Sequence, residues 1–204
     1  MTGQPITFSA ADADGGALDR LSAAAGAARG KGAAPVERWN PPFCGDIAMR
    51  IAADGIWFYN GTPIGRPALV KLFASILRKD PDRFVLVTPV ERVGITVEDA
   101  PFLAVEMAVE GEGFNRTIAF RTNVDDLVPI DPAHPLRFET DEGGGVKPYL
   151  RVRGDLWALV TRALTYDLIE LAEDRDCGAE VMFGVAVGDA FFPIAAAADK
   201  VAPP

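Results

Sequence analysis

The chain has 204 residues, a formal net charge of −9, one histidine and two cysteines. An acidic surface repels nucleic-acid phosphate, so binding to nucleic acid is disfavoured. One histidine and two distant cysteines cannot supply the ligand sets of common zinc sites or a disulfide framework, and we expect no cofactor.

Nothing in the sequence approaches the ~18 consecutive apolar residues of a membrane-spanning helix. The N-terminus is acidic and polar, without the basic and then apolar segments of a secretory signal. We therefore expect a cytoplasmic protein with no membrane partner. In that compartment Cys44 and Cys177 should be reduced and buried, and His134, which lies between prolines, should sit in a solvent-facing loop.

Residues 1–38 are predicted to form an N-terminal arm. Leu18, Leu21 and Ala25 have the spacing of a short helix. The tract that follows, 23–35, is rich in alanine and broken by glycine. Such a tract buries too little apolar surface to offset its ordering entropy, so it predicts a flexible linker.

The next segment predicts a hairpin and a helix. Apolar and polar residues alternate over 46–51, which is typical of a strand, and Asp54-Gly55 is a hairpin turn signal before a second strand at 56–59. Pro67 suits the first position of a helix. Apolar residues then recur at helical spacing from Leu69, and we expect the helix to continue to about Asp80.

Strands dominate the rest of the chain. We expect strands at 84–88 and 93–97, a long hairpin over 102–122, and a proline-rich connector over 123–135. A second unit then contains a strand at 136–140, a glycine turn, and a strand that ends at Arg153. Asp155 is a suitable N-cap for a second helix that runs to Leu171. A final hairpin is expected over 180–195.

The order of these elements suggests an internal repeat, with one copy at 46–97 and another at 136–195. Gly55-x-x-x-Tyr59 matches Gly145-x-x-x-Tyr149, and Arg66 precedes Leu69 as Arg153 precedes Leu156. Matches of this kind also arise by chance in α+β chains. The predicted fold class is α+β, with two related ββαββ-type units and an inserted long hairpin. The predicted domains are 1–38, 39–98 and 99–204.

Three stretches of sequence resemble a known family. They are CGDIAMRIAADGIWFYNGTPIGR (44–66), LVTPVERVGITVEDAPF (86–102) and KPYLRVRGDLWALVTRA (147–163). They are similar to a proteobacterial conserved-domain family of unknown function. The resemblance implies a duplicated α+β arrangement whose C-terminal part is superficially like a pleckstrin-homology fold. It also implies a ligand site at the interface of the two units, for a protein, peptide or nucleic acid, and a role in signalling, but no enzymatic activity.

Two sets of arginine and aromatic residues are the candidate ligand-binding residues. The first set is Arg50, Asp54, Trp57, Tyr59 and Arg66, and the second is Tyr149, Arg151 and Arg153. Arginine offers a planar fork of donors and stacks on aromatic rings, so these sets could hold an anionic or planar ligand. Alternation along the strand is expected to place all three residues of the second set on one face. The alternative for the first set is that its aromatics belong to the core and that Arg66 caps a helix or pairs locally. The alternative for the second set is an exposed strand face.

These observations predict a non-enzymatic protein that binds a protein, peptide or small-molecule ligand at the junction of its two units. A second hypothesis is an enzyme that uses Glu91, Glu98 and Asp99 as acid and base. A third is a structural homodimer paired through the edge of strand 103–109.

Overall fold

The computed structural model describes residues 10–28, 34–141 and 143–199. Contacts divide the chain into two compact units, Met1–Arg50 with Trp57–Thr96 and Ile51–Ile56 with Val97–Pro204. Among the described residues, no helix is long and apolar enough to cross a membrane.

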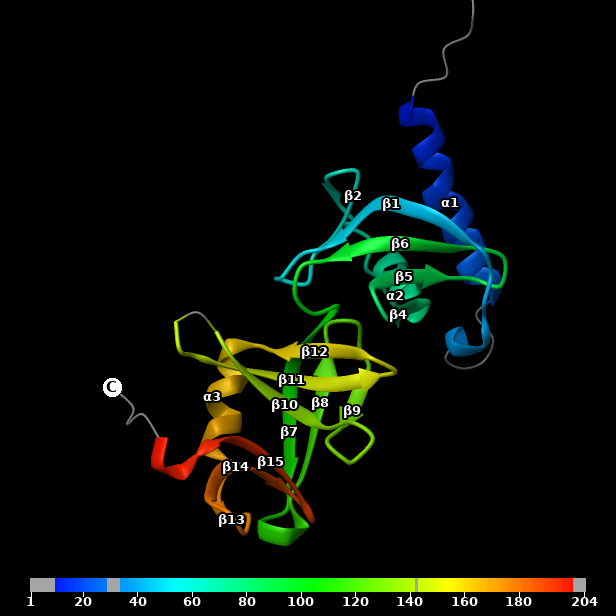
Figure 1. The fold of residues 1–204 in the computed structure, drawn as a ribbon. Helices are drawn as coiled ribbons and strands as arrows, with labels where there is room; N and C mark the ends of the chain where they lie inside the picture. The colour runs from blue at the N-terminus through cyan, green and yellow to red at the C-terminus, as the bar shows by residue number, and fades with distance from the viewer. Residues whose placement is uncertain (1–9, 29–33, 142, 200–204) are drawn as a thin grey trace, which may run out of the picture. The chain divides into compact units, whose positions relative to one another are not determined.

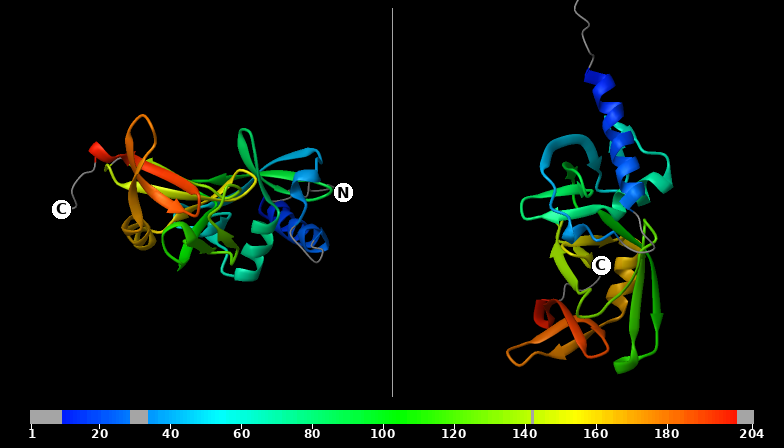
Figure 2. Two further views of the ribbon diagram at one scale, coloured as in Figure 1. Left: turned by 90° about the horizontal axis from the view of Figure 1, so that it is seen from below. Right: turned by 90° about the vertical axis from the view of Figure 1, so that its right-hand side faces the viewer.

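The first unit is a six-stranded sheet in the order β3-β2-β1-β6-β5-β4, with two helices on the same side of it (Figures 1 and 2). Its elements are α1 (Ala10–Ala28), η1 (Val36–Arg38), β1 (Phe43–Ile51), β2 (Trp57–Tyr59), β3 (Thr62–Pro63), α2 (Pro67–Ser75), β4 (Leu77–Asp80), β5 (Arg83–Val87) and β6 (Arg92–Val97).

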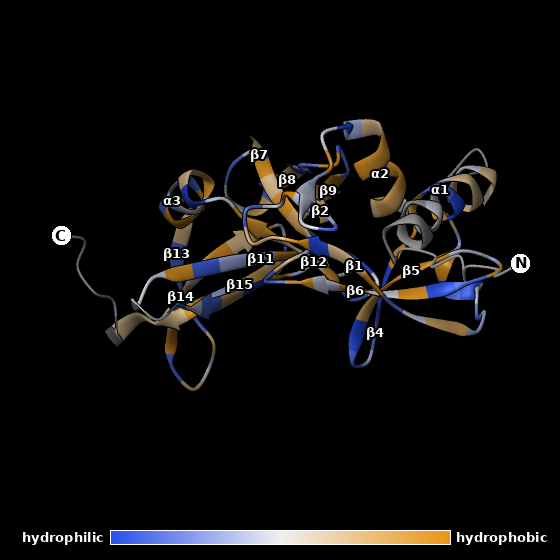
Figure 3. Ribbon diagram, turned by 90° about the horizontal axis from the view of Figure 1, so that it is seen from above, coloured by the Kyte–Doolittle hydropathy of each residue, from blue (hydrophilic) through white to orange (hydrophobic). Residues whose placement is uncertain are grey.

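Helix α2 begins at Pro67 as expected but ends at Ser75, so the prediction that it continues to Asp80 is wrong. Residues 77–80 instead pair with β5, with Leu77 opposite Leu86. Sheet hydrogen bonds in this segment outweigh the helical spacing of its apolar residues. Because β4 is an edge strand, its charged residues also discourage pairing with another chain, and β4 is correspondingly blue in Figure 3.

Helix α1 is longer than the short helix expected, and it includes 23–28, the first part of the predicted flexible linker. Positions 29–33 of that linker lie outside the described residues. Leu21 and Ala25 are fully or almost fully buried, and the exposed Arg20 pairs with buried Glu91 at 3.3 Å. Tertiary contacts therefore support helix in an alanine-rich tract that has little hydrophobic patterning of its own.

The second unit contains a six-stranded sheet, β10-β11-β12-β7-β8-β9, and a three-stranded sheet, β13-β14-β15. Its elements are β7 (Phe102–Glu110), η2 (Gly113–Asn115), β8 (Thr117–Thr122), β9 (Leu127–Pro129), β10 (Leu136–Thr140), β11 (Val146–Arg153), β12 (Leu156–Val160), α3 (Arg162–Glu170), β13 (Ala172–Asp176), β14 (Val181–Val187), β15 (Ala190–Ala196) and η3 (Ala197–Asp199).

The second predicted helix is wrong at its start. Asp155 does not cap a helix, because residues 156–160 form strand β12 and α3 begins only at Arg162. Gly154 adopts a φ of 49°, which favours glycine, in the tight connection that turns β11 back into β12. Leu156, Ala158 and Val160 are buried and alternate with half-buried Trp157 and Leu159, so the true period is two.

The duplication is visible in the order of elements. Three strands, a helix and three strands occur at 43–97 and again at 136–196, which confirms the α+β class and the two related units. Gly55 and Gly145 both lie in the turn between the first two strands of their copies. The equivalence of Arg66 and Arg153 is wrong, since Arg66 precedes a helix whereas Arg153 ends a strand that is followed by another strand.

Three further expectations concern the two cysteines, His134 and the edge of strand β7. Both cysteines are free, but Cys44 and Cys177 are exposed, so their predicted burial is wrong. Cys44 lies near the start of β1, where the strand is still largely exposed, and Cys177 in the turn after β13. His134 does lie in a loop, half-buried, with Nδ1 2.9 Å from Asp131.

Strand β7 pairs with β12 at residues 102–104 and with β8 beyond, so the start of the proposed dimer edge is already paired.

The docking of α1 on the first unit gives a test. Replacing Leu21, which is 0% exposed, by Ala should lower the free energy of unfolding by about 2–5 kcal/mol because it removes packed core volume. The matched control is Leu127→Ala, since Leu127 is 76% exposed and should change stability by less than about 0.5 kcal/mol. Urea denaturation followed by circular dichroism measures both. Equal stability of Leu21→Ala and the wild type would show that α1 is a loose arm after all.

Candidate functional site

The first predicted set of site residues has mixed roles in the structure. The Arg50 guanidinium lies 4.3 Å from the centre of the Phe58 ring, so the arginine stacks on an aromatic of the neighbouring strand. Trp57 is 1% exposed and stacks on Phe73 at 6.5 Å between ring centres, which makes it a core residue. Asp54 accepts a hydrogen bond from the backbone N–H of Ile56 at 3.0 Å and so stabilises the turn.

Tyr59 and Arg66 complete this set. Tyr59 is half-buried at the end of β2, and Arg66 is exposed at the N-cap of α2, where its side chain makes no capping hydrogen bond. The alternative that the aromatics of this set belong to the core therefore holds for Trp57 but not for half-buried Tyr59. That the two predicted sets line one shared groove stays a prediction.

The second set does not share one strand face. A β-bulge between Arg151 and Arg153 shifts the register, so that Arg151 lies opposite half-buried Trp157 and Arg153 opposite buried Leu156. Arg151 donates to the Gly154 carbonyl at 2.6 Å. Arg153 instead bonds Asp126 at 2.7 Å and lies over the buried Phe102 ring. The expected alternation fails here because the bulge adds one unpaired residue to the strand.

Tyr149 belongs to a small polar network with Asp99 and Lys147. The tyrosine is 3% exposed, and its hydroxyl donates to Asp99 Oδ1 at 2.7 Å, while the Lys147 ammonium bonds the other carboxylate oxygen. The hydrogen bond to Asp99 raises the pKa of Lys147, which keeps the amine charged. Burial raises the pKa of Tyr149 above its ordinary 10.0, although the Lys147 hydrogen bond acts in the opposite direction.

The three carboxylates of the enzyme hypothesis each have separate partners. Glu91 pairs with Arg20, Glu98 accepts the Ala53 backbone N–H at 3.0 Å, and Asp99 belongs to the network above. Within the described ranges, no group of three or more histidine, cysteine, aspartate or glutamate side chains is placed to hold a metal ion.

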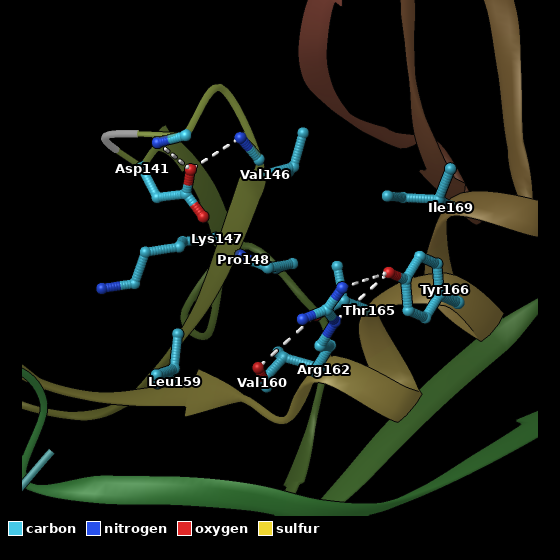
Figure 4. A pocket seen from close by; sticks show the side chains of 12 residues that line it. Asp141, Val146, Lys147, Pro148, Leu159, Val160, Arg162, Thr165, Tyr166 and Ile169 are labelled. Atoms are coloured by element: carbon cyan, nitrogen blue, oxygen red, sulfur yellow. Dashed lines mark hydrogen bonds between the residues drawn. The ribbon is translucent and has the colours of Figure 1, made fainter. Parts of the chain in front are cut away.

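A pocket of about 490 Å³ lies in the second unit where the β10–β11 turn, the start of β11, the end of β12 and helix α3 meet (Figure 4). Its wall is a mixture of apolar and polar side chains, and its residues are Asp141, Gly143, Gly145, Val146, Lys147, Pro148, Leu159, Val160, Arg162, Thr165, Tyr166 and Ile169.

The glycine turn between β10 and β11 forms one side of this pocket. Asp141 Oδ1 accepts the backbone N–H groups of Gly143 and Gly145 at 2.8 and 2.7 Å, which fixes the turn on one side. A Cβ on Gly145 would come within 2.6 Å of the Asp141 carboxylate, so a side chain at this position would collide with that group.

On the other side, buried Thr165 and Leu168 anchor α3 to the unit. Arg162, Tyr166 and Ile169 follow one another at i, i+4 and i+7 and face the pocket together. The Arg162 guanidinium bonds the Tyr166 hydroxyl through Nε at 3.2 Å and through Nη2 at 3.1 Å.

None of the eight residues predicted from the sequence lines this pocket. Tyr149 is linked to it indirectly, through its hydrogen-bond network with the lining residue Lys147. Lys147 could have been found, since it lies two residues before Tyr149 and shares its strand face. Arg162 and Tyr166 show the i, i+4 spacing of a helical pair, but that signal appears only once the helix begins at Arg162 rather than at Leu156.

Comparison with known proteins gives a consistent result. Residues 34–100 match the family model described as the N-terminal domain of DUF1285, a domain of unknown function, and residues 101–194 match its C-terminal domain. A DUF1285 family crystal structure from Silicibacter pomeroyi is 48% identical with a TM-score of 0.79, over 88% of this chain and 96% of that one. Another, from Shewanella baltica, is 31% identical with a TM-score of 0.48, over 61% and 91%. No curated protein matches the chain.

The Tyr149 network predicts a pH effect. Because its folded-state pKa is raised, the folded protein holds this proton above pH 10.0 when the unfolded chain has lost it. The resulting stability is present below pH 10.0 and is lost as the pH rises further. Near-ultraviolet absorbance titration should show a phenol ionising above pH 10.0 that disappears in Tyr149→Phe and persists in Tyr166→Phe. Persistence of that ionisation in Tyr149→Phe would contradict the assignment.

Proposed function

The chain belongs to the DUF1285 family of unknown function, and on this premise we propose that it is a non-enzymatic protein that binds a small molecule in the pocket beside α3. The single observation that carries the proposal is the pocket itself. Its volume of about 490 Å³ falls in the ~300–1,000 Å³ range of small-molecule sites, and its wall combines apolar side chains with polar groups that could orient a ligand.

The side chains at this pocket favour binding over catalysis. A general base acts on a substrate proton within hydrogen-bond reach, and the described carboxylates nearest the pocket each accept hydrogen bonds from the protein. Asp141 accepts two backbone N–H groups, and Asp99 accepts from Lys147 and Tyr149. Arg162 and Lys147 remain cationic at any ordinary pH, which suits recognition of a ligand rather than proton transfer.

The form of the pocket also narrows the partner class. A protein or peptide partner usually requires a long groove or a free sheet edge. This pocket is instead bounded by a turn, two strands and a helix, and it suits a compact ligand. The signalling role implied by the sequence resemblance is part of this proposal, with occupancy of the pocket as the signal.

A fragment screen tests the proposal. We expect small apolar fragments to shift backbone amide resonances of pocket residues in two-dimensional NMR spectra. Ile169→Trp places an indole against the pocket and should weaken those shifts, because it occupies the volume that a fragment needs. The matched control, Leu127→Trp, changes an exposed residue of the same unit outside the pocket wall and should leave them unchanged.

Folding of both variants is checked by circular dichroism before the titrations. Fragments that leave the pocket amides unshifted, or shifts that survive Ile169→Trp at full size, would refute a binding site at this position.

A further inference from the structure

The described part of the protein matches the charge of Arg162 only in part, through the electrostatic effect of Asp141. Arg162 is exposed on α3, and its guanidinium hydrogen-bonds the neutral Tyr166 hydroxyl. Across the part of the chain that the structure describes, no carboxylate lies within 4.0 Å of this guanidinium. A guanidinium has five N–H donors, and the tyrosine engages only two of its three nitrogens, so donors remain for a ligand.

The other cation in the pocket wall is in a different situation. Lys147 pairs with Asp99, and its ammonium points away from Arg162 (Figure 4). Its charge is therefore largely matched within the protein. Asp141 is the acidic residue in the described pocket wall, and both of its backbone hydrogen bonds fall on one oxygen. Arg162 is thus the lining group best placed to bind a negative charge.

Tyr166 holds the guanidinium in place before any ligand arrives. Two hydrogen bonds to one hydroxyl fix the plane of the Arg162 side chain, and the Tyr166 ring lies beside it with its centre 5.9 Å from the guanidinium carbon. A side chain that is already ordered loses less entropy on binding. A planar guanidinium also matches the geometry of two oxygens on one carboxylate or phosphate group.

The remainder of the pocket suits a hydrocarbon body. Val146, Pro148, Leu159 and Ile169 supply the apolar wall from two strands and the helix. A ligand with its charged group at Arg162 would place its apolar part against these residues.

Resting on the proposed function, we infer that the ligand is a small amphipathic oxyanion. Its carboxylate or phosphate group binds Arg162, and its short apolar body packs on Val146, Pro148, Leu159 and Ile169.

The test compares hexanoate with hexan-1-ol, which has a similar apolar body but no charge. NMR titration should give pocket shifts with both, with hexanoate binding about tenfold or more tightly, as expected for a hydrogen bond to a charged group. Arg162→Gln should remove this difference and leave hexan-1-ol binding unchanged. Arg175→Gln is the matched control, because Arg175 lies on β13 outside the pocket wall.

Hexyl phosphate is the second anionic probe, and the tighter of the two anions identifies which oxyanion the site prefers. Tyr166→Phe should weaken both anions by a smaller factor than Arg162→Gln, because it removes the positioning of the guanidinium and not its charge. If hexanoate and hexan-1-ol bind the pocket equally and Arg162→Gln changes neither, the inference is overturned while the proposed function stands. If none of the three probes shifts pocket amides, both are overturned.

Discussion

The hydrogen bonds of the Asp99 carboxylate are the interaction on which the candidate site of the second unit depends. The carboxylate accepts the Tyr149 hydroxyl on one oxygen and the Lys147 ammonium on the other, and so joins the segment before β7 to the start of β11. All three side chains are mostly shielded from water, and removing one partner would leave the others with poorly satisfied polar groups. By holding β11 at this point, Asp99 also fixes the edge of the pocket that Lys147 contributes.

The opposite wall of the pocket forms because residues 156–160 are a strand and not the first turns of a helix. The bulge at Arg151 and Arg153 and the positive φ of Gly154 reverse the chain immediately into β12. Residues 156–160 are then used as a strand that pairs with β11 and, in parallel, with the start of β7. The helix can begin only after that strand, at Arg162, which carries this arginine to the pocket. Had the helix begun after Asp155, Arg162 would lie two turns into it.

Duplication explains the shared scaffold but not the site. Both copies run as three strands, a helix and three strands. In the second copy, β12 also pairs with β7 of the preceding hairpin, and the glycine turn at 141–145 is held by Asp141. The first copy has no counterpart of that carboxylate in its turn of equal length, where Asp54 accepts the N–H of Ile56 instead. The two copies therefore share a fold while their turns and neighbouring strands differ.

The sequence by itself determined most of the alternating strands and the repeated order of elements, because these follow from local periodicity. It also determined the turns at Gly55 and Gly145 and the start of α2 at Pro67, because these follow from the φ preferences of glycine and proline. It also singled out Tyr149, but in a set with Arg151 and Arg153 and not with its observed partners Asp99 and Lys147. Only the tertiary structure decided the rest. Helix at 10–28, strand at 77–80 and strand at 156–160 depend on packing and on hydrogen bonds from distant segments. The meeting of Lys147, Arg162 and Tyr166 depends in turn on the β11–β12 register, which a single bulged residue sets and which local sequence does not encode.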